Sequence, residues 1–163
     1  MSASEPSEPA PRPWSAALTD VLGIAAEAST LTLATTSPRR LAQAAPLFFA
    51  AEADGALLFV SDPESRHSLN ISATGSAAVA FHRETWDWRE IAGVQMEGSV
   101  RAIPPGPERA AAWKTYEAKF PFAAAFEEVV ARSLVYRFTP RWVRLVDNRV
   151  RFGHREEFTP GEA

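Results

Sequence analysis

Residues 57–71 read LLFVSDPESRHSLNI, where an apolar run gives way to a polar turn and then to the start of a helix. The apolar run is typical of a buried strand, and Ser65 suits the position that precedes a helix. Hydroxyl groups, the Arg66 guanidinium and the free N–H groups of a helix start together suit a bound phosphate. No other segment combines these elements so closely. The stretch therefore predicts a strand, a turn and a helix that together hold a phosphate group.

Alternating and apolar runs on both sides of this stretch predict an antiparallel fold. The Asp54-Gly55 pair suits a tight hairpin between two neighbouring strands. Strands linked in this way indicate a mainly β or α+β protein, an antiparallel barrel or sheet with peripheral helices. The expected strands cover residues 30–36, 45–52, 56–61, 76–82, 90–103, 134–138 and 142–147, with a further short strand at 150–152.

Helical patterns appear in three regions of the chain. Residues 15–28 carry apolar side chains at helical spacing, with Ser15 as the expected N-cap. Residues 65–74 form the helix of the opening stretch, and Gly75 is placed to end it in the left-handed conformation. A helix over 107–119 and a second helical piece that ends at Ala131 predict an αα insertion between strands.

The chain length indicates one domain, because 163 residues are enough to bury a single substantial core. The expected domain covers residues 14–158. Residues 1–13 (MSASEPSEPAPRP) lack an apolar run and are rich in Pro, Ser and Glu, so we expect a disordered tail. Residues 159–163 should fray.

The composition of the chain limits which partners and which cellular location we expect. A formal net charge of −3 with scattered Arg residues argues against nucleic acid as a partner. The absence of Cys agrees with a reducing cytosol, and neither a secretory signal nor a membrane span is evident, so a cytoplasmic location is the default. His67, His82 and His154 lack the spacing of metal ligands, and we expect no metal site.

The sequence lacks the short motifs that mark common dinucleotide, nucleoside triphosphate, hydrolase and zinc sites. The sequence contains no G-x-G-x-x-G after a strand, no phosphate-binding lysine loop, no G-x-S-x-G and no H-E-x-x-H. No residue stands out as a catalytic acid or base. The function must therefore be sought in a pattern spread along the chain.

Four separated pieces of the sequence carry such a pattern, which resembles the pyridoxamine 5′-phosphate oxidase-like FMN-binding split-barrel superfamily. The pieces are Leu58–Ser61, Ser65–Asn70, the strand that ends at Phe81-His82, and Val94–Gly98. The resemblance covers about residues 31–158 and implies an antiparallel split β-barrel. The ending, from Trp142 to Arg155, looks like the terminal strand and tail of uncharacterised bacterial members of this superfamily.

The resemblance also implies cofactor-binding residues. Ser61, Ser65 and Arg66 stand at places that contribute to FMN binding in the family, and their hydroxyl and guanidinium groups suit the phosphate end; His67 occupies the place of a family lysine. Gln95 stands where the family has a flavin contact. Three residues near the expected place of the late flavin contacts complete the candidate set: Trp142, Arg144 and Asn148.

Simpler interpretations remain open for several of these residues. Ser65 can act only as a helix cap, and Gln95 can face solvent on a polar strand face. Trp86 and Trp88 can belong to the core, or can shape a ligand pocket or a dimer contact. The Arg residues of the ending can form a solvated strand face rather than an anion site.

What the resemblance implies about function is an FMN-dependent oxidoreductase acting on an unidentified small molecule, in a homodimer with the cofactor at the subunit interface. Pyridoxamine phosphate oxidation itself is not favoured, because the substrate-phosphate residues of that enzyme cannot be placed here. The alternative is a non-enzymatic protein of the same fold that binds or carries flavin or haem, with His67 or His154 as the axial ligand to test. A dimer that binds no cofactor is the third interpretation.

Overall fold

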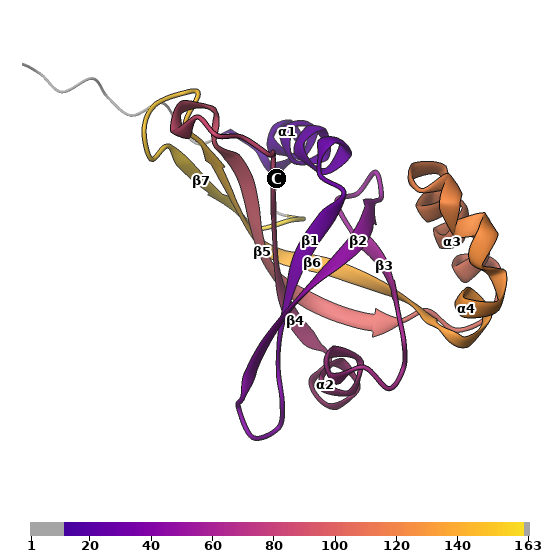
Figure 1. Cartoon of the computed structure of the whole chain (residues 1–163). Coiled ribbons are helices and arrows are strands. Elements are labelled where there is room, and N and C mark those ends of the chain that lie inside the picture. Colours follow the sequence, from indigo (N-terminus) through magenta and orange to yellow (C-terminus); the bar gives the residue numbers. More distant parts are fainter. Residues whose placement is uncertain (1–11, 162–163) are drawn as a thin grey trace, which may run out of the picture.

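Seven antiparallel strands form one continuous sheet, and six of them close into a barrel (Figure 1). The structure, a computed structural model, describes residues 12–161. The strands follow the order β3-β2-β1-β4-β5-β6-β7, and an additional pairing of β3 with β6 closes the barrel. The predicted antiparallel barrel with peripheral helices is therefore confirmed. The elements are α1 (Trp14–Glu27), β1 (Thr30–Thr36), β2 (Ala42–Ala51), β3 (Leu57–Ser61), α2 (Arg66–Thr74), β4 (Ser76–His82), the 3₁₀ turn η1 (Trp88–Glu90), β5 (Ala92–Ala102), α3 (Pro107–Lys119), the 3₁₀ segment η2 (Pro121–Phe126), α4 (Glu127–Arg132), β6 (Leu134–Asp147) and β7 (Arg155–Phe158).

The opening stretch of the sequence adopts the predicted conformation. β3 is followed by a turn, and the Ser65 hydroxyl caps α2 by accepting a hydrogen bond from the Ser68 N–H at 3.3 Å. Gly75 ends α2 with φ of +64°, and Gly55 supplies a φ of +88° in the β2–β3 hairpin. Both glycines adopt a conformation that residues with a Cβ rarely take.

The structure corrects the prediction at the end of the barrel, where residues 134–147 form one strand rather than two. Pro140, which lies between the two expected strands, is at a β-bulge. Gly98 pairs with Pro140 and Glu97 pairs with Trp142, so Arg141 is the additional residue. A bulge tolerates proline because the ladder does not need its missing N–H at that point. A Cβ at Gly98 would lie 2.2 Å from the Thr139 carbonyl oxygen, so this approach of the strands requires glycine.

Two smaller predictions are wrong. Residues 150–152 form a turn, and the short last strand is β7. The turn is held by side chains, because Asp147 Oδ1 accepts from the Arg149 N–H at 2.9 Å and Asn148 Oδ1 accepts from the Gly153 N–H at 3.0 Å. At the other end of the chain, Pro13 and not Ser15 is the N-cap of α1.

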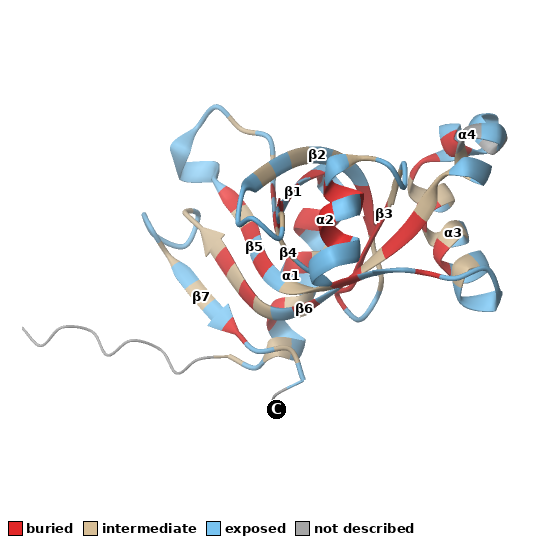
Figure 2. Ribbon diagram, turned by 90° about the horizontal axis from the view of Figure 1, so that it is seen from below, coloured by how far each residue is buried: buried red, intermediate tan, exposed pale blue. Residues whose placement is uncertain are grey.

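The barrel interior forms the main core, and the helices lie around it. Phe49, Phe59 and Phe138 are fully buried inside the barrel, and buried residues alternate with exposed ones along β1 (Figure 2). In Figure 1, α1 and α2 lie at opposite ends of the barrel, while α3 and α4 lie together at one side. No helix within residues 12–161 is long and apolar enough to cross a membrane.

Candidate functional site

The end of β3 and the start of α2 bring three of the predicted phosphate residues into contact. Ser61 Oγ shares a hydrogen bond with His67 Nε2 at 2.5 Å and lies 3.3 Å from Ser65 Oγ. The Ser65 hydroxyl also donates to Ser68 Oγ at 2.8 Å. Ser65 is thus a helix cap and a member of a hydroxyl network at the same time. We call Ser61, Ser65, Arg66 and His67 the β3–α2 group.

Arg66 is the permanent positive charge of the β3–α2 group. It is exposed, and it makes no hydrogen bond or ion pair with the residues that the structure describes. The first N–H groups of α2 have no partner inside the helix, as at every helix start. The Ser68 N–H is capped by Ser65, so Arg66 and the N–H groups of Arg66 and His67 are the ones available to an anion from solvent.

His67 differs in character from the lysine that the resemblance would place there. Its side chain is buried, and this burial lowers the pKa of His67 below its ordinary value. The imidazole is therefore mostly neutral near pH 7. It contributes a hydrogen-bonding nitrogen rather than a fixed charge.

The remaining predicted residues lie on β5, β6 and the β6–β7 turn. Gln95 is exposed and pairs in register with Arg144. Arg144 stacks over Trp142 at 5.0 Å and donates to Glu157 Oε1 at 2.6 and 3.0 Å. Asn148 Nδ2 donates to the Trp88 carbonyl oxygen at 2.7 Å. No hydrogen bond or ion pair among the described residues joins these side chains to the β3–α2 group.

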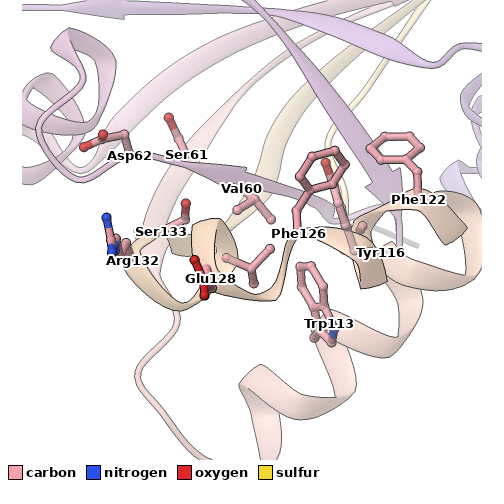
Figure 3. A pocket seen from close by; sticks show the side chains of 12 residues that line it. Val60, Ser61, Asp62, Trp113, Tyr116, Phe122, Phe126, Glu128, Arg132 and Ser133 are labelled. Carbon is pink, nitrogen blue, oxygen red and sulfur yellow. The ribbon is translucent and has the colours of Figure 1, made fainter.

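Two cavities border these two sets of residues. The larger, of about 560 Å³, lies between β3 and the α3–η2–α4 segment and includes Ser61 (Figure 3). The second, of about 460 Å³, lies over β1, β4, β5 and the β6 bulge and includes Trp142. The first has the volume of a small-molecule site. Its lining residues are Val60, Ser61, Asp62, Trp113, Tyr116, Phe122, Ala123, Phe126, Glu128, Val130, Arg132 and Ser133.

The aromatic residues of the larger cavity were missed by sequence reasoning. Trp113 and Tyr116 lie three residues apart on one face of α3, which was a usable signal, although core helices show the same spacing. Trp86 and Trp88 had been considered instead. They are exposed rather than core residues, and they line neither of the two cavities.

The family of the chain follows from a comparison with family models. Residues 20–147 match the model described as pyridoxamine 5′-phosphate oxidase. The chain belongs to the pyridoxamine 5′-phosphate oxidase family. The match contains β1 to β6, and thus the β3–α2 group, the larger cavity and the β6 bulge. No curated protein matches the sequence.

Solved structures of the same fold come from several bacteria. A haem-binding protein from Mycobacterium smegmatis has a TM-score of 0.76 and 21% identity; the match covers 91% of this chain and 59% of that protein. The haem storage protein HutZ from Vibrio cholerae has a TM-score of 0.63 and 11% identity, with 79% and 91% covered. A NimC/NimA family protein from Clostridium acetobutylicum has a TM-score of 0.64 and 14% identity, with 88% and 93% covered. At these identities the similarity shows the fold.

Proposed function

We propose that this member of the pyridoxamine 5′-phosphate oxidase family binds FMN and acts as an FMN-dependent oxidoreductase on a small molecule. The observation that carries the proposal is the β3–α2 group, in which Ser61 contacts both Ser65 and His67 and the neighbouring Arg66 has no partner within residues 12–161. A phosphate needs several donors and a positive charge in one place. The group offers both.

The residues present fit the phosphate end of FMN. Arg66 supplies a planar guanidinium, and the N–H groups of Arg66 and His67 at the start of α2, with Ser61 and His67 beside them, add donors. Bound FMN would supply the electron-transfer chemistry, while the chain would anchor and orient the cofactor. A location in the cytoplasm agrees with this role and is part of the proposal.

The proposal includes a homodimer with the cofactor between the subunits. Gln95 is exposed on the outer face of β5, and Trp142 and Arg144 are half-buried beside it on β6. A second chain can approach these side chains from solvent. They would then contribute to a site that includes the β3–α2 group.

A titration of FMN fluorescence tests the role of Arg66. We expect Arg66→Ala to weaken FMN binding by about tenfold or more, since a hydrogen bond to a charged group contributes roughly 1.5–3 kcal/mol. The matched control is Arg39→Ala, because Arg39 is an exposed arginine on the β1–β2 turn without a described partner. If both variants bind FMN as tightly as the natural protein, the phosphate does not bind at the β3–α2 group.

A haem-binding or carrier protein is the second candidate, because two of the structurally similar proteins are described as binding or storing haem. The histidines offer limited support for it. His67 Nε2 is already bonded to Ser61, and His154 Nε2 lies 3.5 Å from Glu156 Oε2. A visible spectrum after incubation with haemin and, separately, with FMN decides between the two cofactors. A Soret band that persists after gel filtration would favour haem.

A further inference from the structure

We propose that the larger cavity binds an uncharged, planar aromatic molecule, oriented by a hydrogen bond from the Tyr116 hydroxyl to an acceptor oxygen. The cavity lies between β3 and the α3–η2–α4 segment and shares only Ser61 with the β3–α2 group. The inference goes beyond the flavin site, and binding does not require FMN to be present.

The walls of the cavity are rich in aromatic rings. Trp113 and Tyr116 stack with 5.7 Å between ring centroids, and Phe122 and Phe126 meet edge to face at 6.4 Å. Figure 3 shows these four side chains together at one side of the cavity, with Val60 beside them. Flat rings of this kind favour a flat apolar ligand, which gains both burial and ring–ring contact.

The aromatic walls are attached to the barrel before any ligand arrives. Phe48 of β2 packs edge to face on Phe122 at 5.5 Å, and Arg109 of α3 donates to the Ser133 carbonyl oxygen at 3.1 Å. These contacts join η2 to β2 and α3 to the residue that links α4 with β6. A preformed pocket avoids part of the ordering cost of binding.

Tyr116 provides the polar feature that points to a ligand. Its side chain is only 7% exposed, and its hydroxyl makes no hydrogen bond with the residues that the structure describes. Burial raises the pKa of Tyr116, so the hydroxyl stays protonated at neutral pH. The hydroxyl oxygen itself is not sealed from solvent, so an acceptor oxygen on a ligand in the cavity can replace the water that this hydroxyl otherwise meets.

The charges around the cavity favour an uncharged ligand. Asp62, Glu128 and Arg132 lie on its lining and are all exposed, with Arg132 making no ion pair with a described residue. Because all three side chains are exposed, their charges stay hydrated and attract an ion of either sign only weakly. An ionised ligand would lose its hydration among the aromatic rings, and these exposed charges would offset only a small part of that cost.

Equilibrium dialysis with naphthalene derivatives tests the proposal. 2-Acetonaphthone and 2-ethylnaphthalene differ by one carbonyl oxygen, and we expect the ketone to bind about fivefold more tightly, the effect of one neutral hydrogen bond. Tyr116→Phe should abolish this preference while leaving hydrocarbon binding unchanged. Tyr136→Phe is the matched control, because Tyr136 is the other tyrosine of the chain and lies outside the cavity.

Further variants and probes test whether the ligand lies in this cavity and whether the cavity is distinct from the flavin site. Phe126→Ala changes a ring that is 53% exposed, so the fold should persist while both naphthalenes bind more weakly. 2-Naphthoate and 2-naphthylmethylammonium should bind less tightly than the ketone. Tighter binding of either ion, a ketone preference that survives in Tyr116→Phe, or no binding of any probe would overturn the proposal. Displacement of the ketone by FMN would assign the cavity to the flavin and overturn it as well. If FMN fails to bind while the ketone binds as expected, only the flavin proposal fails.

Discussion

At the position after Arg66 the chain carries a buried histidine, where the resemblance would place a permanently charged lysine. The imidazole of His67 is neutral, and its Nε2 forms a hydrogen bond of 2.5 Å with Ser61 Oγ. Burial lowers the pKa of His67 in the free protein, whereas a phosphate beside it would favour the protonated ring and raise that pKa. Proton uptake would therefore accompany FMN binding.

The pH dependence of FMN affinity follows from this linkage. We expect affinity to rise as the pH falls from 8 to 6, because the bound state takes up a proton that the free state does not hold. His67→Lys should bind FMN more tightly at pH 8 and show a flatter profile, since lysine is charged throughout this range. Flavin titrations at several pH values measure both effects. Equal or weaker binding by the lysine variant at pH 8 would mean that His67 does not lie at the phosphate.

At the scale of single elements, the β-bulge between β5 and β6 depends on one glycine. A Cβ at Gly98 would meet backbone atoms of Thr139, whereas a Cβ at Gly23 in α1 would have nothing within 4 Å. We expect Gly98→Ala to lower the free energy of unfolding by roughly 2–4 kcal/mol, a size typical of backbone strain. Gly23→Ala should raise it by up to about 1 kcal/mol, because alanine favours the helix. Urea unfolding curves of both variants check the two signs, and a mild effect at Gly98 would contradict the close approach.

Lys119, at the end of α3, links this helix to the end of α1. Lys119 Nζ donates to the carbonyl oxygens of Ala25 and Ala28, each at 2.7 Å, at the end of α1. Burial lowers the pKa of Lys119 to about 8, so most of the amines remain charged at pH 7. Lys119→Met should cost about 1–3 kcal/mol of stability, because the helix end loses its donors. Thermal unfolding measures the loss, with Lys114→Met on the exposed face of α3 as a control that should change little.

The elements also show what could be read from the sequence. Residues 30–36 were predicted at their observed bounds because alternation and the following Ser37-Pro38 mark the strand, and residues 76–82 because they follow the helix-ending Gly75. Residues 134–147 were predicted as two strands, and Pro140, a residue type that normally interrupts a strand, lies in the gap between them; only the pairing with β5 shows the bulge that accommodates it. The contact of Ser61 with His67 lay within one short segment and was predictable in outline. The aromatic cavity was not, since Val60 and Tyr116 meet only through the packing of α3 on the barrel.

At the scale of the whole molecule, the distribution of the candidate residues favours an assembly of two chains. No hydrogen bond or ion pair among the described residues joins the β3–α2 group to the residues around Gln95, and Gln95 faces solvent. A light-scattering measurement during gel filtration should give twice the chain mass of 17.8 kDa. A monomer that binds FMN with full affinity would show that the residues around Gln95 belong to no shared site.

The central claim is that this chain holds FMN. Its most direct test is gel filtration after incubation with excess FMN, with the absorbance of flavin and of protein recorded across the eluted peak. The account predicts that flavin elutes with the protein at one FMN per chain and that Arg66→Ala elutes with far less. A colourless protein peak, with all of the flavin eluting separately, would contradict it.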